Sequence, residues 1–106
     1  MDDVNMRGSV LDKAKTIING ARQDQYGNPE DSFASIAKFW NAYIGCKMGL
    51  EGFTIIKSKD VALMMTVFKI ARELHGAGKE DNMIDAAGYI GLAADMSLYP
   101  KENSNG

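Results

Sequence analysis

The stretch VALMMTVFKIARELH, residues 61 to 75, decides the fold class of this chain. The periodicity of its apolar residues predicts an α-helix. Ser58, which precedes it, belongs to a residue type that caps helices, and Gly76, which follows it, is a good left-handed terminator. This helix is apolar around most of its circumference, which is typical of a central bundle helix or of one in an oligomer interface.

A second mostly apolar helix follows downstream. It opens near Glu80 or Asp81 and continues through MIDAAGYIGLAADMSL until Pro100, where proline stops it. Its small residues predict a close contact with another helix, because glycine inside a helix otherwise costs about 1 kcal/mol against alanine. These residues are Ala87, Gly88, Gly91 and Ala94. Gly88 is also expected to leave open space beside Asp85.

Two amphipathic outer helices are predicted upstream. Asn28 before Pro29 is a strong start signal, with asparagine as N-cap and proline at the first helical position, for a helix that runs to about Cys46. The first helix spans about residues 10 to 24, and Ser9 with Asp12 resembles a capping box.

The segment after the second helix is predicted to be a loop. Gly45, Gly49 and Gly52 interrupt it, and FTII at 53 to 56 has no partner strand elsewhere. The sequence therefore predicts an all-α bundle of four main helices in one domain, 1–106, with flexible ends at 1–8 and 100–106. It also predicts a homo-oligomer, because the two apolar helices offer more apolar surface than two outer helices cover.

Composition narrows the class of protein. Hydrophobic residues make up 45% of the 106 residues, and 12 lysines and arginines face 14 acidic residues. This balance gives no electrostatic basis for nucleic acid or a membrane as the main partner. The lone Cys46 excludes an internal disulfide, and no apolar run suggests a signal peptide or a span of roughly 20 residues. A cytoplasmic protein is expected.

Several polar residues fall at unexpected positions on the helices. On the third helix one sector is predicted to face water or line a site; it holds Ala62, Thr66, Lys69 and Glu73. Arg72 instead projects among apolar neighbours, where a guanidinium needs a partner. The structural interpretation is that Arg72 pairs with Asp85 or Asp81 and ties the last two helices together, while Lys69 is solvated.

The functional interpretation takes these polar residues as one ligand site at an end of the bundle. Lysine and arginine suit phosphate, a tyrosine ring suits stacking on a base, and paired carboxylates suit Mg²⁺. Asp81 and Asp85 are the candidate metal ligands. The full predicted set is Asp24, Tyr26, Glu30, Lys69, Arg72, Asp81 and Asp85. The alternative at Tyr26 is a well-capped turn.

Three motifs in this order resemble a group of small phage and prophage proteins of uncharacterised function. The motifs are RQDQYGNPEDSFASIAKFW, DVALMMTVFKIAR and DNMIDAAGY, and the likeness covers most of residues 20 to 92. The group is similar to the nucleotide-modification-associated domains of phages and, more remotely, to MazG-like all-α nucleoside triphosphate pyrophosphatases. The resemblance implies a phage-encoded nucleotide-binding protein in the host cytoplasm.

MazG-like enzymes hold Mg²⁺ with an E-E-x-x-E helix followed by an E-x-x-D helix. Here Asp85 matches the second pattern and Asn82 departs from it, while the preceding helix offers Lys69 and Arg72 where acids are required, and Glu73 alone as an acid. The resemblance thus implies a relative of a magnesium-dependent nucleotide pyrophosphohydrolase with a degraded metal site, and leaves enzymatic activity open. The alternative is a non-enzymatic phage protein that binds a host protein or sequesters a signalling nucleotide.

Overall fold

The computed structural model describes residues 5–20, 28–76 and 80–98 of the chain. Within these residues the chain forms helices and no strand. The helices are α1 (Met6–Asn19), α3 (Pro29–Met48), α4 (Ser58–His75) and α5 (Glu80–Leu98). The predicted all-α fold is confirmed, and residues 53–56 lie in a loop as predicted.

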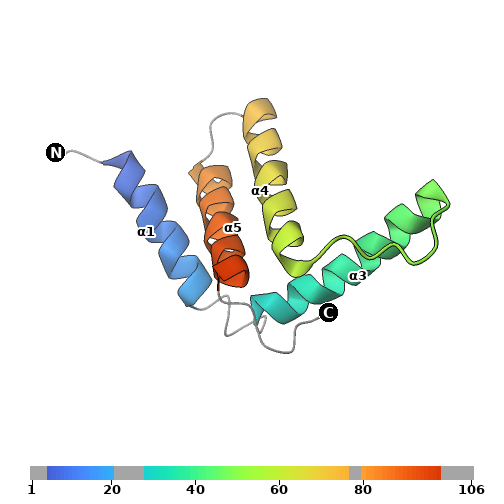
Figure 1. The fold of residues 1–106 in the computed structure, drawn as a ribbon. Coiled ribbons are helices and arrows are strands. Elements are labelled where there is room, and N and C mark those ends of the chain that lie inside the picture. The colour runs from blue at the N-terminus through green and yellow to red at the C-terminus, as the bar shows by residue number, and fades with distance from the viewer. Residues whose placement is uncertain (1–4, 21–27, 77–79, 99–106) are drawn as a thin grey trace.

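Three of the helices form a single layer. Figure 1 shows α1, α5 and α4 side by side, with α5 in the middle, while α3 crosses at one end of the layer and extends away from it. The radius of gyration is 15.8 Å, against about 13 Å for a compact domain of this size. The layer therefore has two broad faces, and much of α3 lies apart from it.

The buried apolar residues lie where these helices cross. They are mostly small, which brings the helix backbones close together, and Val61 is the largest fully buried side chain among them. The set comprises Ala14, Ala37, Val61, Ala62, Ile84 and Ala93. The core is thin because one layer of helices encloses little volume.

The start of α3 follows its prediction. The Asn28 side chain accepts a hydrogen bond of 2.9 Å from the Glu30 amide, and Pro29 occupies the first helical position. The helix runs two residues beyond the predicted end at Cys46, because Gly49, with φ of 70°, terminates it in the left-handed conformation. Gly45 therefore lies inside the helix rather than in the loop.

The N-caps of α1 and α4 differ from the predicted ones. Asn5, not Ser9, caps α1 by accepting a hydrogen bond of 3.1 Å from the Gly8 amide, so the helix begins four residues earlier than predicted. At α4 the N-cap is Lys57, whose amide donates to Asp60 Oδ2 at 2.9 Å. Ser58 is thus the first helical residue, and its hydroxyl donates to the Glu30 carbonyl at 3.4 Å.

The end of α4 also differs in geometry from the prediction. The helix stops before Gly76, whose amide donates to the Arg72 carbonyl at 2.7 Å. Its backbone is extended, with φ of −98°, and not left-handed. A side chain at Gly76 would meet the Arg72 carbonyl oxygen, since a Cβ there would lie 2.9 Å from it. The close approach of the Arg72 carbonyl oxygen, rather than a positive φ, explains why position 76 holds a glycine.

The loop after α3 folds back along the helix. The buried Asn41 side chain forms two hydrogen bonds of 2.9 Å with the backbone of Ile56, one to the amide and one to the carbonyl. The Asn41 side chain thus satisfies the backbone groups of Ile56 that a neighbouring strand would satisfy in a sheet. Because residue 56 lies just before α4, the same contact sets the direction in which α4 begins.

The contact between α1 and α5 depends on glycines. A Cβ at Gly88 or at Gly91 would lie 3.2 Å from atoms of the Ile18 side chain. The predicted close helix contact is therefore confirmed at these two positions. The expectation of open space beside Asp85 at Gly88 is wrong, because Ile18 occupies it. Among the described residues, no helix is long and apolar enough to span a membrane.

Candidate functional site between α1 and α5

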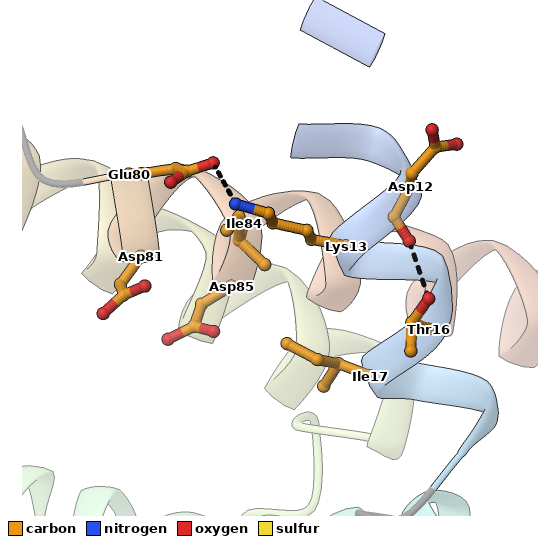
Figure 2. A pocket seen from close by; sticks show the side chains of 8 residues that line it. All are labelled: Asp12, Lys13, Thr16, Ile17, Glu80, Asp81, Ile84 and Asp85. Carbon is orange, nitrogen blue, oxygen red and sulfur yellow. Dashed lines mark hydrogen bonds and ion pairs between the residues drawn. The ribbon is translucent and has the colours of Figure 1, made fainter. Parts of the chain in front are cut away.

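A hollow of about 550 Å³ lies between α1 and the start of α5 (Figure 2). Residues near the middle of α1 form one wall and the first two turns of α5 form the other. The lining residues are Asp12, Lys13, Thr16, Ile17, Glu80, Asp81, Ile84 and Asp85. The hollow thus includes both acids that the sequence marked as candidate metal ligands.

Two of the α5 carboxylates, those of Asp81 and Asp85, lie next to each other in this hollow. Asp81 and Asp85 are one helical turn apart, and Figure 2 shows their side chains pointing the same way from α5. Ile17 and Ile84 provide apolar surface beside them. The arrangement offers two carboxylates to one ligand, with an apolar wall within the same hollow.

An ion pair connects the two walls. Lys13 Nζ of α1 lies 2.9 Å from Glu80 Oε2 of α5, and both side chains remain accessible to water. The Thr16 hydroxyl donates at 3.0 Å to the Asp12 carbonyl within α1, so it is occupied by its own helix. Lys13 is the one cation among the lining residues.

A second lysine reaches the site from α4. Lys69 Nζ lies 3.0 Å from Asp85 Oδ2, and the two side chains are only 16% and 24% exposed. The prediction that Lys69 is solvated is therefore wrong. The predicted tie between the last two helices exists, but Lys69 and not Arg72 forms it with Asp85.

Arg72 lies on the exposed surface of α4. Its guanidinium carbon is 5.8 Å from the centre of the Phe68 ring, and Lys69 Nζ lies at the same distance from that ring. Because Arg72 is exposed, its charge needs no buried partner. The prediction that it projects into an apolar environment is wrong, and the helix presents Phe68 as well to solvent, half exposed.

The polar sector of α4 faces α5 rather than water. Thr66 is buried and its hydroxyl donates to the Ala62 carbonyl at 2.9 Å. Glu73 Oε1 accepts a hydrogen bond of 3.3 Å from the buried Asn82 side chain. Of the two expectations for this sector, that it faces water is wrong, because these polar groups find partners inside the helix pair. Lys69 of the same sector contacts Asp85, which lines the hollow. Asn82, which departs from the E-x-x-D pattern, faces α4.

The remaining predicted site residues do not join this group. Glu30 opens α3 and its carbonyl contacts Ser58 at the first residue of α4, the end of α4 opposite the loop that leads to α5. The prediction that Glu30 converges with Lys69 and Asp85 is wrong for this reason. Asp24 and Tyr26 lie outside the described residues.

Negative charge predominates around the hollow. Four carboxylates, those of Asp12, Glu80, Asp81 and Asp85, face two lysines, Lys13 and Lys69. This excess favours a ligand that carries a cation. Among the described residues no group of three or more histidine, cysteine or acidic side chains is placed to hold a metal ion. A cation bound here by Asp81 and Asp85 would take its other ligands from water or from the bound molecule.

Comparison with known proteins assigns the family. Residues 9–97 match the model of a domain of unknown function, DUF6378. The chain belongs to this family.

Two relatives are named Gene 55 protein. That of Mycobacterium phage L5 is 41% identical over 98 residues, covering 88% of this chain and 58% of the relative. That of Mycobacterium phage D29 is 34% identical over 97 residues, covering 92% of this chain and 59% of the relative. The chain thus spans about three fifths of the length of these relatives, and no solved structure matches it.

Proposed function

We propose that this chain binds a magnesium-complexed nucleoside phosphate in the hollow between α1 and α5. One observation carries the proposal: Asp81 and Asp85 face the same hollow one helical turn apart, and Lys69 supports Asp85 from the neighbouring helix. In proteins Mg²⁺ takes one or two carboxylates together with phosphate oxygens of the substrate. The two acids therefore supply the protein's share of such a site.

Each residue has a distinct role in this proposal. Lys69 contacts Oδ2 of Asp85, and Oδ1 is the oxygen that we assign to the ligand. Asp81 is exposed and provides the second carboxylate. Lys13, on the opposite wall, offsets phosphate charge. Ile17 supplies apolar surface for the base or sugar. Most small-molecule sites are lined largely by apolar side chains.

The function proposed for the hollow is nucleotide binding, without hydrolysis. Hydrolysis with two metals, or with a water activated by a metal, uses a larger set of carboxylates than Asp81 and Asp85. Hydrolysis, which the sequence resemblance to magnesium-dependent pyrophosphohydrolases suggests, is therefore tested separately, by measuring phosphate or pyrophosphate release from any nucleotide that binds.

The binding experiment is a thermal-shift and calorimetric titration with nucleoside mono-, di- and triphosphates, each with Mg²⁺ or with a chelator. A ligand that binds the folded chain raises its melting temperature by mass action. We expect a Mg²⁺-dependent shift, and at least a tenfold weaker affinity in Asp81→Asn. Asp95→Asn, an exposed acid of α5 outside the hollow, is the matched control and should bind as the parent does.

Two results would contradict the proposal. No shift with any nucleotide in the presence of Mg²⁺ would remove nucleotide binding. Equal weakening in Asp81→Asn and Asp95→Asn would show that the general negative charge of α5 matters rather than the hollow.

A second candidate function, binding of a host protein, is favoured by α3. Phe39 and Tyr43 lie one turn apart and are 75% and 67% exposed. Exposed aromatic residues are common anchors of protein interfaces. In a pull-down from host lysate, a stoichiometric partner that is lost in Phe39→Ala/Tyr43→Ala would support this function, and a partner that is retained would exclude this surface.

A further inference from the structure

The α4 helix presents an apolar stripe to solvent. Leu63, Val67, Ile70 and Leu74 are 40%, 63%, 52% and 79% exposed. Their spacing of four, three and four residues is that of the seam by which helices pack in coiled coils. A seam of this kind on the open side of a helix indicates that another helix packs there.

The stripe continues onto α5. Met83 and Ile90, seven residues apart on one side of α5, are each 49% exposed. Val67 precedes Lys69 by two residues and Met83 precedes Asp85 by two, so each lies about 200° around its helix from a member of the ion pair. The ion pair and the apolar residues therefore occupy opposite faces of the helix layer.

We call this surface the α4–α5 face; it consists of Leu63, Val67, Ile70, Leu74, Met83 and Ile90. In the single layer of Figure 1, none of the described helices is stacked upon the layer formed by α1, α5 and α4.

A second copy of this chain fits the face best. The six residues that define the face are all uncharged, so these residues of two copies meet without like-charge repulsion. An apolar helix pair is also complementary to itself, as a twofold interface requires.

The size of the face is sufficient. Helices of 18 and 19 residues are roughly 27 Å long, and two of them side by side are about 20 Å wide. The projected area is then roughly 540 Å², and side-chain relief brings the accessible surface towards the ~800 Å² per partner of a standard interface.

We infer that the chain forms a homodimer through the α4–α5 face, with the apolar stripes of two copies packed against each other as the second layer of the fold. The hollow between α1 and α5 shares the side of α5 that carries Asp85, opposite Met83, so the dimer leaves it open to ligands. The inference stands independently of the proposed function.

The test is the molar mass of the purified chain by light scattering coupled to size exclusion. We expect twice the 11.6 kDa of one chain. Val67→Glu places a charge at the centre of the face in both copies and should give a folded monomer. Tyr43→Glu, at an equally exposed apolar position on α3, is the matched control and should stay dimeric.

The inference is overturned by a parent chain that is monomeric at micromolar concentration, or by a dimer that Tyr43→Glu dissociates and Val67→Glu does not. If Val67→Glu fails to fold, Val67→Ala/Ile70→Ala is compared with Phe39→Ala/Tyr43→Ala by sedimentation equilibrium. At least a tenfold weaker dimer for the first pair alone supports the face, and unchanged or equal dissociation constants overturn it.

Discussion

Lys69 Nζ lies 3.0 Å from Asp85 Oδ2, and this ion pair joins the C-terminal half of α4 to the second turn of α5. Both side chains are mostly withdrawn from water, so removing one leaves the other partly buried without its partner. We expect Lys69→Met to lower the free energy of unfolding by about 1 to 2 kcal/mol, between the values for exposed and for buried pairs. Urea denaturation followed by circular dichroism measures it.

The matched control for this pair is Lys13→Met. The Lys13–Glu80 pair has a similar distance, 2.9 Å, but its side chains are 53% and 32% exposed. Its loss should cost below about 0.5 kcal/mol. Equal losses in the two variants would show that withdrawal from water does not strengthen the Lys69–Asp85 contact.

Asn41 is expected to be among the most sensitive polar residues of the described part. Asn41→Ala removes two hydrogen bonds and leaves the amide and carbonyl of Ile56 without that partner. We predict a destabilisation of about 2 kcal/mol by chemical denaturation. Asn19→Ala, at an exposed position of α1, should change stability by less than about 0.5 kcal/mol. A small effect at Asn41 would mean that water replaces its hydrogen bonds.

The contact of Gly88 with Ile18 limits side-chain size on α5. Gly88→Leu forces α1 away from α5 and should destabilise the fold by about 1 to 3 kcal/mol in thermal or urea unfolding. Removing the obstructing side chain in Gly88→Leu/Ile18→Ala should recover part of the loss. If the double variant loses as much free energy of unfolding as the sum of the losses in Gly88→Leu and Ile18→Ala, the two residues do not share this contact.

Gly8, unlike Gly88, has room for a side chain. A Cβ there would lie no closer than 3.6 Å to the Asn5 side chain. Gly8→Ala should therefore raise the free energy of unfolding of α1 and of the whole chain by up to about 1 kcal/mol, through helix propensity. A destabilised Gly8→Ala would indicate that the Asn5 cap requires glycine at this position.

The N-cap of α3 is a local feature with a separable effect. Asn28→Ala removes the 2.9 Å hydrogen bond to the Glu30 amide and should cost about 1 kcal/mol. Ser35→Ala, at an exposed position within α3, should be neutral or slightly stabilising by the same denaturation assay. Equal effects would show that helix propensity and not capping sets stability here.

The sequence by itself determined the helices and the start of α3. Periodicity gives the angle between residues on one helix, and Asn28 with Pro29 acts through bonds within a few residues, so both are local properties. The Asn5 cap was missed because Ser9 and Asp12 offered an equally plausible local signal. The close approach of Gly88 was predictable as a small-residue face, but its neighbour Ile18 was not.

Only the tertiary structure decided which side of each helix meets a neighbour. Lys69 and Arg72 are both cations in the C-terminal half of α4, and the position of α5 places the first against Asp85 and the second in solvent. The same packing turns the apolar stripe around Val67 outward and gathers Asp81 with Asp85 beside α1. Periodicity carries no information about where other helices lie, so the pairing of charges and the exposure of the stripe depend on contacts between residues far apart in the sequence.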